Sequence, residues 1–167
     1  MKLMLWLTLL YTSFLQKLNA PDIIAVRELY VLAATQKEAA NKLSYLLADI
    51  NPSSSPLLIC FKGCSEMMVS KYAVNPYNKY RKFKTGKAYI EQANKLDSNN
   101  IEIRFLRFSV QTNLPSFLGY REEINKDKNF LISHLTLSKD ANLKKTVINY
   151  LAGSGYCTQE ELKKLKQ

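Results

Sequence analysis

The sequence predicts an all-α fold, with one helical domain over residues 21–167 after a short N-terminal segment. Apolar residues recur at the three- and four-residue spacing of a helix face, and no stretch alternates apolar and polar residues as a half-buried strand does. A chain of 167 residues can bury a core without a disulfide framework or a structural metal. We expect about seven helices, arranged as antiparallel hairpins or as an irregular helical bundle.

Capping residues and prolines mark the helix boundaries in the first half of the chain. Thr35 and Glu38 have the spacing of a capping box, so one helix ends before Thr35 and a second begins after it. Ser55 precedes a proline, which is a typical N-cap and first-turn pair, and the Asn75-Pro76 pair separates the next two helices. These signals predict helices over residues 22–34, 36–49, 56–74 and 77–96.

Similar signals divide the second half. A fifth helix follows the polar break at 97–100 and covers 101–112, and a loop with proline and glycine occupies 113–120. A sixth helix follows this loop. Asp140 is the predicted N-cap of a seventh, and a capping box at Thr158 opens a short, Lys-rich last helix.

The fifth predicted helix is apolar over more than half of its circumference, so we expect it to be central. Arg104, Arg107 and Gln111 form its remaining stripe, which we expect to face water or a polar cleft. Two interpretations are open. The stripe is a groove that binds an acidic peptide or an anionic group, or the arginines pair with acids on neighbouring helices and fix their register. Tyr120 either lines the same surface or packs as an anchor of the loop.

A basic stretch precedes this helix. Charged residues alternate with Tyr80 and Phe83, a combination found in surfaces that contact nucleic acid or anionic membranes. Alternatively, the aromatic side chains pack inward and the charges lie in water. The basic residues of this predicted patch are Lys79, Arg81, Lys82, Lys84 and Lys87.

The formal net charge of +10 raises the question of a nucleic-acid partner, which we do not expect for an exported chain. Chemistry-bearing residues are sparse. His134 is the only histidine, and the acids near residue 122 lie among basic residues as in a solvated helix face. No metal-binding spacing, phosphate loop or nucleophile motif occurs. We therefore predict no catalytic residues, no metal site and no cofactor.

The N-terminus has the layout of a secretory signal peptide. Lys2 precedes an apolar run over 3–15 and a polar stretch that ends at Ala20. Pro21 in the first mature position disfavours cleavage, so an uncleaved anchor is the alternative for residues 1–20. This pattern predicts an exported protein, periplasmic or associated with the cell envelope.

The three cysteines predict little chemistry. Cys60 and Cys64 are four residues apart in a predicted helix and are poorly oriented for a disulfide. We expect them, and Cys157, to be small buried residues, although one long-range bridge from Cys157 is an alternative.

Two junctions between helices, 47–54 and 94–100, are similar. Around the second, Gly86, Ile90 and Ala93 resemble the second helix of a tetratricopeptide repeat (TPR) with its exit turn. Gly63, in the preceding helix, offers a flat surface for close packing. The sequence therefore favours TPR-like hairpins over a regular array.

Several segments also resemble a family of uncharacterised, exported helical proteins of Bacteroidota. The resemblance covers residues 28–136 and is most specific from Arg104 to Tyr120; it also includes Phe61-Lys62-Gly63, Glu66-Met67-Met68, Asn75-Pro76 and Phe83-Lys84-Thr85-Gly86-Lys87. It implies export and an all-α fold, and it supplies no activity, because the family has no assigned catalytic residues.

Together these observations predict a non-catalytic binding or scaffold module of the cell envelope that offers a helical groove to a protein or an acidic peptide. The alternative is a basic surface that binds anionic lipid or polysaccharide, and an enzyme is the least favoured class.

Overall fold

The computed structural model describes residues 20–165, and over these residues it is all-helical, as predicted. Its eight α-helices correspond to the seven longer predicted segments and the short last one. They are α2 (Ile23–Ala33), α3 (Lys37–Leu46), α4 (Pro56–Lys71), α5 (Pro76–Leu96), α6 (Ile101–Asn113), α7 (Ile124–His134), α8 (Ala141–Gly153) and α9 (Gln159–Lys164), with 3-10 turns η1 (Ser116–Leu118) and η2 (Leu135–Leu137).

Side-chain caps explain most helix starts. Ser55 accepts a hydrogen bond from the backbone N–H of Leu58, Asp140 accepts one from Leu143, and Thr158 forms the predicted capping box with Glu161. The capping box predicted at Thr35 is wrong. The Thr35 hydroxyl donates to the carbonyl of Leu32, so it closes the end of α2 and does not cap α3.

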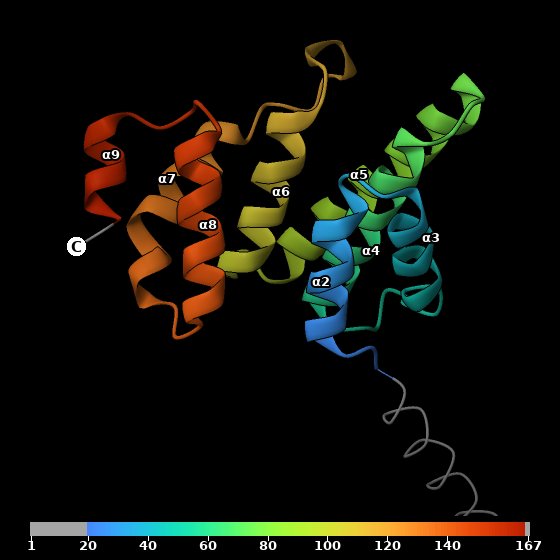
Figure 1. Ribbon diagram of the computed structural model, residues 1–167, viewed down its shortest axis with the longest axis horizontal. Coiled ribbons are helices and arrows are strands. Elements are labelled where there is room, and N and C mark those ends of the chain that lie inside the picture. Colours follow the sequence, from blue (N-terminus) through green and yellow to red (C-terminus); the bar gives the residue numbers. More distant parts are fainter. Residues whose placement is uncertain (1–19, 166–167) are drawn as a thin grey trace, which may run out of the picture.

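Helix α6 lies between two groups of helices (Figure 1). The hairpins α2–α3 and α4–α5 pack on one side of it, and α7, α8 and α9 pack on the other. Two hydrophobic clusters result. One contains Ile103, Leu106 and Val110 of α6, and the other contains Phe105 and Phe108. The prediction that this helix is central is therefore confirmed.

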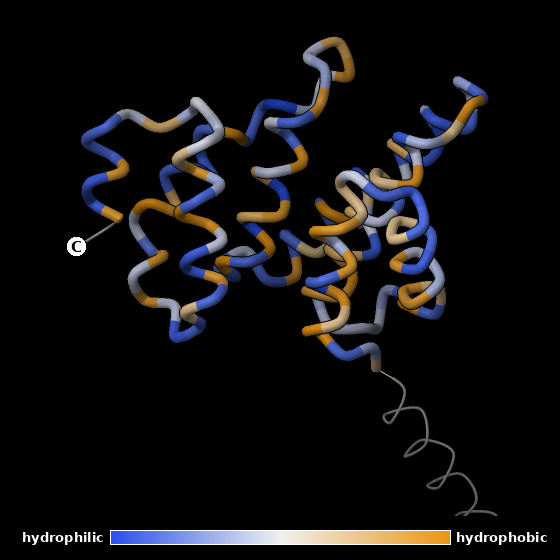
Figure 2. Tube along the Cα trace, in the orientation of Figure 1, coloured by the Kyte–Doolittle hydropathy of each residue, from blue (hydrophilic) through white to orange (hydrophobic). Residues whose placement is uncertain are grey.

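Hydropathy follows the same arrangement (Figure 2). Apolar segments of the helices turn toward one another, whereas α3 and α9 carry mostly hydrophilic residues on their outer turns. Apolar colour also appears at two outer ends of the molecule, in the α4–α5 turn and in the loop after α6. These ends include Val74 and Phe117, which are 98% and 85% exposed.

Helices α4 and α5 approach each other closely where Gly63 faces Gly86. A Cβ atom built on Gly63 would lie 2.7 Å from the carbonyl oxygen of Gly86, and one on Gly86 would lie 2.7 Å from the carbonyl oxygen of Gly63. Because both neighbours are backbone atoms, neither can move aside alone. The prediction of close packing at Gly63 is confirmed, and its partner is the glycine singled out in the TPR-like segment.

Cys60 and Cys64 are buried free thiols, as expected, and Cys157 is a half-buried free thiol. No helix among residues 20–165 is both long and apolar enough to cross a membrane. The predicted signal peptide or anchor lies almost wholly in residues 1–19, outside the described residues.

We expect Gly63→Ala and Gly86→Ala each to lower the free energy of unfolding by about 1–3 kcal/mol, because the added methyl group forces α4 and α5 apart. Urea denaturation monitored by circular dichroism measures this change. Gly153→Ala is the matched control, since no atom lies within 4 Å of its Cβ position and alanine favours the helix. A loss of stability at Gly153 equal to that at Gly63 would contradict the packing argument.

Candidate functional site

The charged stripe of α6 is buried. Arg104, Arg107 and Gln111 are 7%, 2% and 0% exposed. The prediction that this stripe faces water or a polar cleft is wrong, because α5 and α7 cover the face of α6 that carries it. The Gln111 amide nitrogen and oxygen have no hydrogen-bond partner among residues 20–165.

Both arginines bind Asp127 of α7, which is fully buried. The Nε and Nη2 atoms of Arg107 lie 2.7 Å and 2.8 Å from the two carboxylate oxygens, and the Nη1 atom of Arg104 lies 2.6 Å from one of them. One carboxylate thus accepts three charge-assisted hydrogen bonds from two guanidinium groups. The alternative interpretation, in which the arginines pair with acids on neighbouring helices, is confirmed.

Other donors of these arginines bind further partners. Arg107 reaches Glu91 of α5 at 2.9 Å and Glu123, before α7, at 3.4 Å. Arg104 donates from Nε to the carbonyl of Ser98. Its guanidinium also lies 4.7 Å from the centre of the Phe130 ring. These groups link α5, α6 and α7 and present no free guanidinium group to a partner.

Tyr120 belongs to the same buried cluster and not to a binding surface. It is 2% exposed, and its hydroxyl donates to Oε1 of Glu91 at 2.6 Å. Burial, and then the hydrogen bond to Glu91, raise the pKa of Tyr120, so the hydroxyl keeps its proton. Burial disfavours the charged form of Arg107, but the hydrogen bonds and charges of Asp127 and Glu91 outweigh it, and the pKa of Arg107 is raised.

A second ion cluster joins α2, α6 and α8. Arg27 donates to both carboxylate oxygens of Glu102, at 2.7 Å and 2.6 Å, and to Asp140 at 3.0 Å. The sequence predicted Asp140 as an N-cap, which is correct, but it gave no indication of the pairing with Arg27. The partners are 75 and 113 residues apart in sequence, so no local pattern indicates the pairing.

The predicted basic patch is divided among several surfaces. Lys82 pairs with Glu66 of α4 at 2.9 Å, and the ammonium of Lys87 lies 4.7 Å from the centre of the Tyr120 ring. Phe83 packs inward, as the alternative interpretation had it, but Tyr80, which the same interpretation placed inward, is 55% exposed. Exposed basic side chains remain at Lys79, Arg81 and Lys84.

Among residues 20–165, an apolar groove has a cavity volume of about 620 Å³. Segments from α2, α4, α5, α6 and η1 form it, and we call it the apolar groove. Its lining includes Tyr30, Ala34, Met67, Met68, Ser70, Lys71, Lys79, Tyr80, Phe83, Ser109, Val110, Asn113, Leu114, Phe117 and Leu118.

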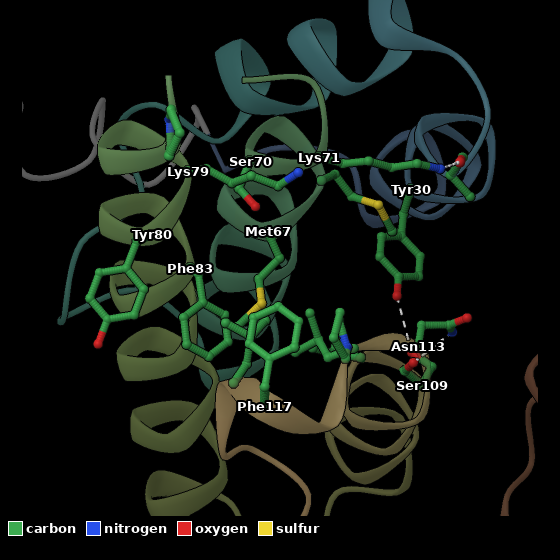
Figure 3. A pocket seen from close by; sticks show the side chains of 17 residues that line it. Tyr30, Met67, Ser70, Lys71, Lys79, Tyr80, Phe83, Ser109, Asn113 and Phe117 are labelled. Atoms are coloured by element: carbon green, nitrogen blue, oxygen red, sulfur yellow. Dashed lines mark hydrogen bonds between the residues drawn. The ribbon is translucent and has the colours of Figure 1, made fainter. Parts of the chain in front are cut away.

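Figure 3 shows how these side chains surround the groove. Met67 and Phe83 lie at its centre, Lys71 and Lys79 lie toward one edge, and Phe117 lies toward the opposite edge. Tyr30 closes one end, and its hydroxyl lies 3.1 Å from that of Ser109. Sequence reasoning missed this groove as a site, because its walls come from three separate parts of the chain. The sequence feature that could have indicated it is Phe117, an aromatic residue in the loop between Pro115 and Gly119.

Chemistry-bearing groups do not gather elsewhere in the part of the chain that the structure describes. His134 stacks on Phe130, with ring centres 4.2 Å apart, and its Nδ1 atom lies near the carbonyl of Phe130. No group of three histidine, cysteine or acidic residues in 20–165 has the geometry to hold a metal ion. Comparisons with protein-family models, curated proteins and solved structures find no match to this chain.

We expect Asp127→Asn to lower the free energy of unfolding by about 3–5 kcal/mol. The asparagine amide nitrogen cannot accept a hydrogen bond, so the buried guanidinium groups lose charge compensation. Urea denaturation measures the change. Lys126→Gln is the control, because it removes an exposed pair with Glu123 and should cost less than about 0.5 kcal/mol. A change below about 1 kcal/mol for Asp127→Asn would contradict the role of this cluster.

The Arg27–Glu102–Asp140 cluster predicts a specific response to acid. The backbone N–H of Leu143, and after it Arg27, hold the pKa of Asp140 below its ordinary value of 3.8. The unfolded chain therefore binds this proton at a higher pH than the folded chain, and the free energy of unfolding falls as the pH drops below about 4.

We expect Asp140→Asn to reduce the loss of stability between about pH 5 and pH 3, because asparagine keeps the N-cap but does not titrate. The urea midpoint measured across this range tests the prediction. Glu122→Gln, an exposed acid without an ion pair among residues 20–165, is the control. Parallel pH curves for wild type and Asp140→Asn would show that Asp140 contributes nothing to the acid response.

Proposed function

We propose that this chain is a non-catalytic helical binding module, and that a segment of a partner protein occupies the apolar groove. The single observation that carries the proposal is the groove itself. A volume of about 620 Å³ with a mainly apolar lining is a typical binding cavity, whereas a monomeric protein gains nothing by leaving such a surface open to water.

The composition of the groove supports a protein segment as the occupant. Met67 and Met68 supply flexible, polarisable side chains that adapt to apolar partners, and Phe83 and Phe117 supply large aromatic surfaces. Helical folds bind amphipathic helices in grooves of this kind. Asn113 and Ser70 are available as polar contacts that orient a bound segment.

The same proposal includes a location in the cell envelope and a TPR-like arrangement of the helices. The charged and apolar pattern of residues 1–20 and the resemblance to exported Bacteroidota proteins support a module of the cell envelope. Successive helical hairpins and the Gly63–Gly86 contact support a TPR-like arrangement. Many TPR-like modules present grooves to peptides, which agrees with a scaffold role.

A second candidate function is adhesion to anionic lipid or polysaccharide. The observation in its favour is the exposure of Lys79, Arg81 and Lys84 on α5, near the exposed rings of Tyr77 and Tyr80. Fewer basic residues are free than the sequence suggested, since Lys82 pairs with Glu66. We therefore place this function second.

The proposed function predicts a protein crosslink from the groove. A photo-reactive phenylalanine analogue in place of Phe117 should give a discrete protein adduct in the producing cells. The added substitution Ala34→Trp should remove the adduct, because this exposed residue lines the groove and an indole fills it. Ala48→Trp, also exposed but away from the groove, is the matched control and should leave the adduct intact.

Gel electrophoresis and mass spectrometry of the adduct provide the measurement. An adduct that persists in Ala34→Trp would place the partner outside the groove. The absence of any protein adduct, with both tryptophan variants folded by circular dichroism, would contradict a protein partner for this site.

A further inference from the structure

The end of the molecule that carries the groove has an asymmetric charge. From residue 67 to residue 90 the sequence contains six basic residues and no acid. The opposite wall of the groove, from 109 to 118, contains no charged residue at all. Acids are therefore missing from both walls, although the chain as a whole contains 14 of them.

Two of the basic residues border the groove itself. Lys71 and Lys79 are exposed and line it, and none of its lining residues is acidic. Neither lysine belongs to an ion pair among residues 20–165. Lys71 donates one hydrogen bond to the carbonyl of Ala34, which leaves two of its three N–H donors for a ligand.

The apolar floor of the groove is buried. Met67 and Phe83 are 8% and 6% exposed, whereas Phe117 and Tyr80, which also line the groove, are 85% and 55% exposed. A flat bilayer surface does not reach a buried floor between exposed side chains, but a ligand with its own ridge of side chains can. No strand occurs among residues 20–165, so an extended peptide has no sheet edge to join.

We propose that the groove selects an acidic amphipathic helix, and this inference rests on the proposed function. Apolar side chains at i, i+3, i+4 and i+7 of the partner pack on Met67, Phe83 and Val110. Carboxylates beside that apolar face lie at Lys71 and Lys79. The partner is thus a helical segment whose apolar face is bordered by glutamate or aspartate on one side.

Two synthetic peptides of about 14 residues, or four helical turns, test the charge requirement. Both carry leucine at the same four apolar positions, and their remaining positions are alanine with either glutamate or lysine. Fluorescence anisotropy with labelled peptides measures binding to the purified chain. We expect the glutamate peptide to bind at least about tenfold more tightly, and its affinity to fall as salt rises from about 50 to 500 mM.

Charge reversal on the protein completes the test. Lys71→Glu with Lys79→Glu should invert the preference between the two peptides, while Lys144→Glu with Lys145→Glu on α8 should leave it unchanged. Lys79→Glu alone keeps the hydrogen bond from Lys71 to Ala34 and should weaken the glutamate peptide without affecting the fold. Circular dichroism verifies that each variant is folded.

Three outcomes overturn the inference. If the two peptides bind equally and Ala34→Trp blocks both, charge selection is wrong but the groove is still a binding site. If neither peptide binds while the crosslink from position 117 is blocked by Ala34→Trp, the proposed function stands and a helical occupant is wrong. If the chain binds vesicles of phosphatidylglycerol and phosphatidylcholine but neither peptide, the exposed basic residues bind an anionic membrane and the inferred helical partner is wrong.

Discussion

The buried carboxylate of Asp127, held by two arginines, is the interaction on which the architecture depends. Helix α6 is covered on nearly all sides, and its two arginines are only 7% and 2% exposed. Two buried cations without a carboxylate between them would cost several kcal/mol each. Asp127 offsets that cost, and Glu91 and Glu123 accept further hydrogen bonds from Arg107. The position of α7 against α6 is therefore fixed by charge as well as by apolar packing.

Helix boundaries were largely predictable because their causes are local. A serine before a proline, an aspartate before an apolar run, or a threonine three residues before a glutamate each act within one turn of backbone. Thr35 shows the limit of this reasoning, because its hydroxyl donates to the carbonyl of Leu32 at the end of α2 and does not cap α3. Gly63 was also predictable as a contact, but its partner Gly86 depended on how α4 and α5 align along their axes.

The candidate site was less predictable, because a helical pattern defines a stripe but not what covers it. Arg104 and Arg107 share a face of α6 whether that face meets solvent or another helix. Their burial follows from the placement of α7, whose acid lies 20 residues beyond Arg107. The predicted basic patch on α5 is divided for a different reason. Consecutive residues point in directions about 100° apart, so one run supplies an ion pair to α4, a ring contact to Tyr120 and a border to the groove.

Helix α6 contributes side chains to both hydrophobic clusters. The two halves of the molecule therefore fold and unfold together. Detaching α7–α9 would expose Phe105 and Phe108, and detaching α2–α5 would expose Ile103 and Leu106, so neither half keeps a closed core alone. Through Val110, Ser109 and Asn113 the same helix also lines the apolar groove. A segment bound as proposed would therefore stabilise α8 and α9, which it does not touch, only against openings that also displace α6.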